Sequence, residues 1–233
     1  MENKKVLLGM SGGVDSSVAA ILLQEQGYEV IGATMKLWEA EEDCIEGSCC
    51  SLSSTYDAKR VCDKLSIPHY TLNFKKEFEE KVINDFIENY KIGRTPNPCI
   101  ECNKHMKFDL FYKKAQELGC EYIATGHYGK TEYSEKYGTY VLKKSEAEKK
   151  DQSYVLYNIP REIIGKVIFP LGKFKTKDEI RKIAEEHELQ IAHKKDSQEI
   201  CFIPDNNYGK FLEKRLKCQN CNEKMLLPRK YSG

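Results

Sequence analysis

The sequence lacks any apolar run that could cross a membrane. Val6 to Met10 is too short for the hydrophobic core of a signal peptide, and no run approaches the ~20 residues of a membrane-spanning helix. We therefore expect a cytoplasmic protein with no part in a membrane. The ten cysteines would indicate a disulfide scaffold only in a small secreted chain. We accordingly expect mostly reduced thiols, some of them functional.

The chain also lacks an excess of charge of either sign. Its 37 basic side chains face 36 acidic ones, which leaves a formal net charge of +1. Such a balance gives no general attraction for nucleic acid, so any RNA-binding surface must be a local patch. A length of 233 residues allows one sizeable α/β domain, with or without an appendage.

Lysine is absent from the glycine-rich stretch Gly9-Met10-Ser11-Gly12-Gly13-Val14-Asp15-Ser16-Ser17. A strand is predicted before it over residues 5–8, and a helix after it ends at Gly27. The missing lysine excludes a Walker A loop, and the glycine spacing excludes the dinucleotide motif G-x-G-x-x-G. Glycines allow close approach of a ligand, and the start of a helix attracts anions. The stretch therefore predicts a phosphate or pyrophosphate site.

Strands and helices are predicted to alternate along the rest of the chain. Further strands are expected over residues 29–35, 69–73 and 121–125, and helices around residues 58–65, 78–90, 108–118 and 177–187. A hairpin is expected over residues 133–142, around Gly138. This order predicts an α/β fold with a doubly wound, mostly parallel sheet and a small helical C-terminal extension.

Two cysteines follow a rigid turn formed by Thr95-Pro96-Asn97-Pro98. Cys99 and Cys102 fall near the start of the next predicted helix, where a thiol ionises more easily. This favours nucleophilic or metal-binding chemistry, and a purely structural pair is the alternative. Cys201 lies between Ile200 and Phe202, and taken alone it suits a buried core thiol better than a catalyst.

Gly126 and His127 follow the strand predicted over residues 121–125. The carboxyl ends of parallel strands face the ligand crevice, so Gly126 would let a nucleotide pass and His127 would meet substrate. A lysine-rich segment then precedes Asp151-Gln152-Ser153-Tyr154. Taken alone, such a segment is usually a solvated face.

The glycine-rich stretch resembles the pyrophosphate loop (PP-loop) of ATP pyrophosphatases. Five motifs together, in the same order between about residues 4 and 212, resemble the tRNA-specific 2-thiouridylase family. They are Gly9 to Ser16, Thr95 to Pro98 with Cys102-Asn103, Ala124 to Tyr128, Lys150 to Tyr154, and Asp196-Ser197 with Ile200 to Ile203.

The resemblance implies an activity and its partners. ATP, arriving with Mg²⁺, would adenylate the C2 oxygen of the wobble uridine in tRNA. Sulfur from a cysteine persulfide would then replace that oxygen, giving 2-thiouridine, AMP and pyrophosphate. A sulfur-relay protein or a cysteine desulfurase would supply the persulfide.

The resemblance also implies roles for individual residues. Cys102 resembles the nucleophile and Cys201 the persulfide carrier. The positions that resemble ATP contacts are Gly9, Met10, Ser11, Gly12, Gly13, Val14, Asp15, Ser16, Met35 and Gly126. The positions that resemble contacts with tRNA or its target base are Asn97, Pro98, Cys99, His127, Lys150, Asp151 and Gln152.

The sequence departs from the family at two places. Cys99 stands where many members have aspartate, so Cys99, Cys102 and Cys201 would alternatively hold an iron–sulfur cluster. We place the persulfide relay first, because three cysteines near one site also suit disulfide exchange. The family normally continues into β-rich domains, which are missing here. We expect a PP-loop ATP-binding catalytic domain over residues 1–158, a mainly helical extension carrying Cys201 over 159–216, and a basic tail over 217–233.

Two other functions remain open at this point. One is an ATP pyrophosphatase or synthetase that acts on a small molecule and needs the loop but neither Cys102 nor Cys201. The other is a truncated homologue that binds tRNA or ATP without full activity.

Overall fold

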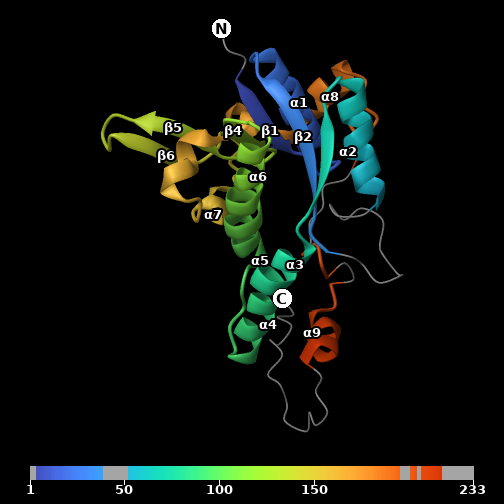
Figure 1. Ribbon diagram of the computed structural model, residues 1–233, viewed down its shortest axis with the longest axis vertical. Helices are drawn as coiled ribbons and strands as arrows, with labels where there is room; N and C mark the ends of the chain where they lie inside the picture. The colour runs from blue at the N-terminus through green and yellow to red at the C-terminus, as the bar shows by residue number, and fades with distance from the viewer. Residues whose placement is uncertain (1–3, 39–51, 195–199, 204–205, 217–233) are drawn as a thin grey trace.

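Five parallel strands form the centre of the protein. The computed structural model describes residues 4–38, 52–194, 200–203 and 206–216 (Figure 1). The sheet has the order β3-β2-β1-β4-β7, and every neighbouring pair is parallel. The strands are β1 (Lys5–Gly9), β2 (Glu29–Lys36), β3 (His69–Asn73), β4 (Tyr122–Thr125) and β7 (Val167–Ile168). The predicted α/β class and its mostly parallel sheet are confirmed.

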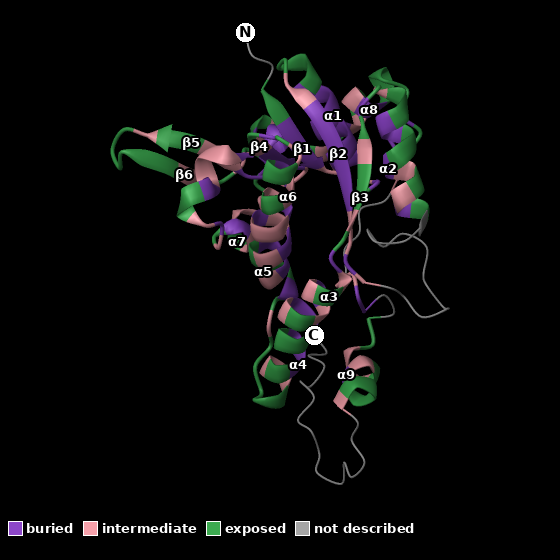
Figure 2. Cartoon of the chain, viewed as in Figure 1, coloured by how far each residue is buried: buried purple, intermediate pink, exposed green. Residues whose placement is uncertain are grey.

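Both faces of the sheet are covered, which explains why the inner strands β1 and β4 are mostly apolar, whereas the edge strand β3 is polar and partly exposed. In β1, Val6 and Leu8 point into one hydrophobic cluster and Leu7 into the other, and all three are fully buried. The Val6 cluster is covered by α1 (Val14–Glu25), α2 (Leu52–Lys64) and α8 (Lys177–Glu186). The opposite cluster takes side chains from the helices between residues 75 and 117. Figure 2 shows β1 and β2 buried together with most of α1, whereas the outer faces of α2 and α6 (Phe111–Glu117) are exposed.

Two long helical segments contain π-helical turns, which the sequence did not indicate. The first comprises α3 (Lys75–Phe78), the π-helix η1 (Glu79–Ile83) and α4 (Asn84–Lys91). The second comprises α5 (Pro98–Glu101), the π-helix η2 (Cys102–Leu110) and α6 (Phe111–Glu117). The second begins where predicted, because the Asn97 side chain accepts a hydrogen bond from the Cys99 N–H and Pro98 occupies the first helical position.

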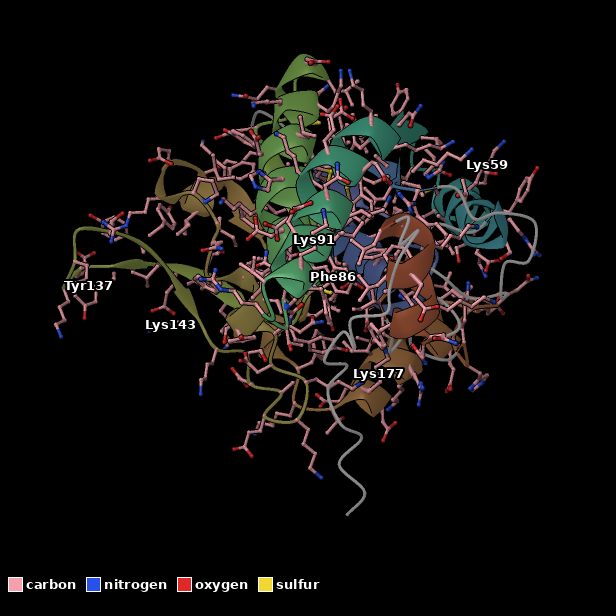
Figure 3. The ribbon with its side chains drawn as sticks, turned by 90° about the horizontal axis from the view of Figure 1, so that it is seen from below. Lys59, Phe86, Lys91, Tyr137, Lys143 and Lys177 are labelled. Carbon is pink, nitrogen blue, oxygen red and sulfur yellow. The ribbon has the colours of Figure 1, made fainter. Side chains whose placement is uncertain are left out.

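A helical lobe beyond the carboxyl ends of the strands contains α3, η1, α4, α5 and α9 (Tyr208–Leu216), whereas α6 lies beside the sheet (Figure 1). α3 starts directly after β3, because Asn73 ends the strand and Lys75 begins the helix. Phe86 of α4 packs against Phe211 of α9, with ring centroids 6.3 Å apart, and Figure 3 shows Phe86 beside α9. The last described helix is thereby attached to this lobe.

A β-hairpin projects from the side of the sheet. It pairs β5 (Lys130–Ser134) with β6 (Thr139–Lys143) and turns at Gly138, which confirms the predicted hairpin. Tyr137 lies near its outer end (Figure 3). The short helices α7 (Ser153–Leu156), η3 (Arg161–Lys166) and η4 (Pro170–Lys173) follow and connect the hairpin to β7 and α8.

The predicted domain boundary at residue 158 falls between α7 and η3. Strand β7 lies beyond that boundary and pairs with β4, so the chain after residue 158 contributes to the central sheet. The division into domains stays a prediction, and the tail over residues 217–233 lies outside the described residues, as do Asp196 and Ser197. Within the described ranges, no helix is both long and apolar enough to span a bilayer.

Candidate functional site

The glycine-rich stretch forms a tight turn between β1 and α1. The Ser11 N–H donates to Ser16 Oγ at 3.2 Å, and the hydroxyl groups of Ser16 and Ser17 donate to the Gly13 carbonyl at 3.1 and 2.9 Å. Gly13 is the N-cap of α1, and no described side chain caps the helix there. The N–H groups of the first turn are thus left to face a ligand, as at other anion sites of helix N-termini.

Two glycines bring this turn close to neighbouring segments. Gly12 has φ +71°, and a Cβ there would collide with the Ser54 carbonyl oxygen at the start of α2. A Cβ on Gly126, just after β4, would lie 2.8 Å from the Ser16 nitrogen. Neither position has room for a side chain. The turn is therefore held between α2 on one side and the end of β4 on the other.

Asp15 anchors the turn through two hydrogen bonds from distant parts of the chain. Tyr128 donates its hydroxyl to Oδ1 at 2.8 Å, and Lys177 donates its ammonium to Oδ2 at 2.6 Å. Lys194 donates to the Gly12 carbonyl at 3.1 Å and to Asp57 at 2.7 Å. Two lysines from late in the chain thus supply the positive charge that the loop itself lacks.

The sequence reasoning missed both lysines. Thr176 and Glu179 form a reciprocal capping box, which fixes the start of α8 and puts Lys177 in its first turn (Figure 3). The helix was predicted to start at residue 177, as observed, but nothing in its pattern indicated a role for Lys177 at the loop. Only the fold brings Lys177 and Asp15 together, because 162 residues separate them.

The predicted ATP residues outside the loop also lie at this edge of the sheet. A Cβ on Gly9 would lie 3.5 Å from Met35 Cε and 3.7 Å from Thr125 Cγ2, so the ends of β1, β2 and β4 meet. Thr34 donates its hydroxyl to the Met10 carbonyl at 2.9 Å and contacts His69 Nε2 at 2.9 Å. The structure therefore brings together Gly9 to Ser16, Met35 and Gly126.

His127 lies next to this edge and packs against the rings of both Phe108 and Phe169, which also contact each other. Its Nδ1 is 2.7 Å from Thr125 Oγ1, and its Nε2 is 3.2 Å from Lys107 Nζ. Desolvation, helped by the charge of Lys107, lowers the pKa of the ring well below its usual value. The neutral ring must accept at Nε2, because an ammonium only donates, and Nδ1–H then donates to Thr125.

The structure places Cys102 and Cys201 on one hydrophobic cluster. Cys102 is buried at the first position of η2, whereas Cys99 is exposed one turn earlier. Cys201 is half-buried in a turn, and the neighbouring Phe202 packs on Phe78 and Phe86 with centroid distances of 5.8 and 5.4 Å. These ring contacts fix the Cys201 turn against the helical lobe.

Cys62 and Cys120, the other cysteines of the described chain, are buried core residues. Cys62 is fully buried in the cluster below α2, and burial, with Asp63 nearby, raises the pKa of its thiol to about 12. Burial likewise raises the pKa of Cys120. A thiol that resists ionisation is a poor nucleophile, so both act as small core residues.

The residues predicted to contact tRNA come from three segments that lie near one another: α5, which starts after Asn97, contacts α7, which starts after Gln152, and Gln152 bonds Tyr128, next to His127. Asn97 is exposed and caps α5, and Lys150 is exposed after the hairpin. Asp151 accepts a hydrogen bond from the Ser145 N–H at 2.7 Å. Gln152 Oε1 accepts a hydrogen bond from the Tyr128 N–H at 2.9 Å, and the Gln152 N–H donates to the Tyr128 carbonyl at 2.8 Å. Asp151 therefore stabilises its own loop, and Gln152 ties that loop to the segment that follows β4. Their contact with tRNA stays a prediction.

The described residues contain no group of three or more His, Cys, Asp or Glu side chains placed to hold a metal ion. Cys99, Cys102 and Cys201 therefore do not form such a group there. The carboxylates nearest the loop, Asp15 and Asp57, are each paired with a lysine.

The parallel sheet, its lysine-free glycine turn and the helix that starts on that turn define a PP-loop α/β protein. Over residues 4–205 the chain matches the family described as the tRNA methyl transferase HUP domain, and it belongs to that family.

Comparison with individual proteins gives close relatives. The tRNA-specific 2-thiouridylase MnmA of Clostridioides difficile is 56% identical over 216 residues, which cover 92% of this chain and 60% of that protein. The MnmA of Caldicellulosiruptor saccharolyticus is 58% identical over 214 residues, or 91% of this chain and 59% of that protein. The chain therefore spans about three fifths of the length of these relatives.

Solved structures share the fold at low sequence identity. A 4-thiouridine synthetase in complex with RNA and ATP has a TM-score of 0.55 and 19% identity, covering 92% of this chain and 51% of that one. An NMN synthetase from Francisella tularensis has a TM-score of 0.52 and 17% identity, covering 84% and 67%.

Proposed function

We propose that this chain performs the ATP-dependent 2-thiolation of the wobble uridine in cytoplasmic tRNA. The names of its relatives, which are more than half identical to it, support this substrate. One observation carries the proposal: the loop region and the two distant cysteines lie at the same end of the sheet. Cys102 follows α5 directly, Cys201 precedes Phe202, whose ring packs on Phe78 and Phe86 of the lobe, and the loop lies at the carboxyl end of β1.

The first step is adenylation of the base. The uridine O2 attacks the α-phosphorus of ATP, and pyrophosphate leaves. The first-turn N–H groups of α1 and the hydroxyls of Ser11 and Ser16 would bind the phosphates, and Lys177 and Lys194 would balance their charge. Mg²⁺ is proposed to arrive bound to ATP, because Asp15 and Asp57 already have lysine partners.

The second step transfers sulfur. The terminal sulfur of a persulfide on Cys201 attacks C2, and AMP leaves with the former O2. The Cys102 thiolate then attacks Cys201 Sγ, which breaks the sulfur–sulfur bond and leaves its electron pair on the sulfur that C2 now carries. A Cys102–Cys201 disulfide forms, and an external dithiol must reduce it. A persulfide-bearing sulfur-relay protein or cysteine desulfurase then restores the persulfide on Cys201.

The test separates the two steps. The full chain is incubated with ATP, a persulfide-loaded cysteine desulfurase and tRNA, and both pyrophosphate and 2-thiouridine are measured. We expect Cys201→Ser to keep tRNA-dependent pyrophosphate release and to lose 2-thiouridine, whereas Asp15→Ala loses both. Cys120→Ser is the matched control, because this buried thiol lies away from the proposed chemistry, and it should keep both.

The competing functions give different results in the same assay. Pyrophosphate release that ignores tRNA and survives Cys201→Ser would indicate a small-molecule ATP pyrophosphatase. A chain that binds ATP or tRNA without any turnover would be a binding homologue. The family description names methyl transfer, and S-adenosylmethionine supplied in place of ATP and the sulfur donor tests that reaction.

An iron–sulfur cluster on Cys99, Cys102 and Cys201 is the alternative sulfur chemistry. The exposure of Cys99 and the burial of Cys102 favour the persulfide route over a shared cluster. Iron and acid-labile sulfide measured on anaerobically purified protein decide between them. About one cluster per chain would overturn the persulfide assignment.

A further inference from the structure

Lys107 is a partly buried cation without an acidic partner in the described part of the chain. Its one hydrogen-bond partner there is His127 Nε2, at 3.2 Å. The other lysines around the site are neutralised: Lys177 pairs with Asp15 at 2.6 Å, and Lys194 pairs with Asp57 at 2.7 Å. Removing a charge from water without a counterion is costly, so this position implies an anionic ligand.

His127 orients Lys107 and does not neutralise it. The imidazole is neutral, because desolvation and the charge of Lys107 lower its pKa. It is fixed by Thr125 Oγ1 at 2.7 Å and by the neighbouring rings of Phe108 and Phe169. A rigid neutral acceptor of this kind holds an ammonium in place and leaves its charge available to a ligand.

The π-helix places Lys107 on the same side of its helix as Cys102. Both residues belong to η2, whose bonding runs from each residue to the fifth one after it, so Lys107 lies about one turn after Cys102. An α-helix, with about 3.6 residues per turn, would separate the two side chains by about 140° around the axis. The irregular helix therefore directs the cation and the thiol the same way.

The same cation lies next to the phosphate turn. His127 directly follows Gly126, whose Cβ position would be 2.8 Å from the Ser16 nitrogen in the first turn of α1. Lys107 is thus connected through His127 to the segment that touches the phosphate turn, and it shares η2 with the cysteine that would act at the base. In an adenylated uridine, the group that joins these two places is the α-phosphate.

We propose that Lys107 contacts the α-phosphate of the bound nucleotide and that His127 is the positioning residue that holds it there. The assignment rests on the proposed ATP-dependent function. During adenylation the ammonium would stabilise charge on the non-bridging oxygens, and during sulfur transfer it would stabilise the departing AMP. The lysines of the other side, Lys177 and Lys194, would serve the pyrophosphate portion.

The test measures binding of separate fragments to the full chain by calorimetry: AMP, adenosine and inorganic pyrophosphate. We expect Lys107→Met to weaken AMP binding roughly tenfold to a hundredfold, the value of a charge-assisted hydrogen bond. Binding of adenosine and pyrophosphate should not change. Lys107→Arg should retain most of the AMP affinity. Lys104→Met is the matched control on η2, because Lys104 is exposed and pairs with Glu101 at 3.9 Å.

Substitutions of His127 test the positioning role. His127→Gln keeps an acceptor for Lys107 and should retain more AMP affinity than His127→Phe. In the Lys107→Met background, His127→Phe should cause no further loss, because the two residues act as one unit. If Lys107→Met also loses adenosine binding, the two His127 variants and Lys107→Arg still test the α-phosphate assignment.

The outcomes separate this inference from the function on which it rests. Unchanged AMP affinity in Lys107→Met, or an equal loss of pyrophosphate affinity, overturns the α-phosphate assignment while ATP binding by the unaltered chain stands. Failure of the unaltered chain to bind ATP and AMP overturns both the assignment and the proposed function.

Discussion

Gly12 cannot be replaced without strain, because both its backbone angle and its neighbours exclude a side chain. Its φ of +71° is costly for any residue with a Cβ, and that Cβ would collide with the Ser54 carbonyl. We expect Gly12→Ala to lower the free energy of unfolding by about 1–3 kcal/mol, or more if α2 cannot shift. ATP affinity should fall as well, because the turn must move. Denaturant melts and ATP titration measure the two effects.

Gly13 is the matched control, since it is adjacent in the same turn. Its φ is −101°, and a Cβ there would meet only Ser11 Oγ at 3.5 Å. Gly13→Ala should therefore cost only what alanine costs at a helix N-cap, about 0.5–1 kcal/mol, and less than Gly12→Ala. Equal destabilisation by the two substitutions would contradict the geometry described for Gly12.

Some residues of the candidate site could be predicted from the sequence, and others could not. Gly9 to Ser16 form a contiguous motif whose residue types already indicate an anion site. Lys107, Lys177 and Lys194 come from segments far from the loop, and a lone lysine on a polar helix looks like a solvated residue. Their partners become visible only when the fold is known.

At the level of elements, the turn that carries Cys201 depends on its neighbour Phe202. This ring is 4% exposed and packs on Phe78, Phe86 and Phe211. Phe202→Ala should lower the free energy of unfolding by about 3–5 kcal/mol. If the chain has the proposed function, the substitution should also reduce 2-thiouridine formation more than pyrophosphate release, because it frees the proposed sulfur carrier Cys201 and leaves the glycine turn intact. The two-product assay measures that ratio.

The control for this prediction is Tyr137→Ala in the hairpin, where the ring is 65% exposed. It should leave both the stability and the product ratio unchanged. A Phe202→Ala variant that loses both products in equal proportion would show that the ring supports the whole site and not the sulfur step alone.

The helices show what the spacing of apolar residues can and cannot predict. Apolar spacing located the segments around residues 78–90 and 108–118, because those residues do face the core. It predicted regular helices, however, and η1 and η2 are π-helical. A π-turn widens a helix by one residue to satisfy tertiary contacts, so the apolar pattern that it leaves is close to that of an α-helix.

For the whole molecule, three histidines set a pH dependence of folding. Desolvation lowers the pKa of His127, His69 and His105 from the usual 6.5. Below pH 6.5 the unfolded chain binds protons that the folded one does not, so stability is full above that pH and is lost as the pH falls. We expect the free energy of unfolding to decrease from pH 7.5 to pH 5.5. Each histidine contributes at most about 1.4 kcal/mol per pH unit.

Substitution of His127 checks the source of this slope. His127→Gln should flatten the dependence of unfolding free energy on pH between 7.5 and 5.5, measured by chemical denaturation. The carboxylates with lowered pKa, such as Glu121 and Glu179, titrate below this window and should not contribute. An unchanged slope in His127→Gln would contradict the burial of a neutral ring.

The strand order was the part of the architecture that the sequence could not supply. Four of the five parallel strands follow from apolar runs bounded by turns, and they match the predicted ranges within one or two residues. The fifth, Val167–Ile168, is too short to leave a pattern. Its pairing with β4 depends on where the hairpin and η3 deliver the chain.

The ion pair between Asp15 and Lys177 joins the first helix to one of the last, and this has a consequence for synthesis. The glycine turn leaves the ribosome long before α8 does. Until α8 docks, the negative charge of Asp15 is not balanced by Lys177 and lies beside the proposed phosphate site. Nucleotide capture would then begin only after the later segment has docked. A chain that ended before Lys177 would lack this counterion, and we expect it to bind ATP more weakly than the full chain.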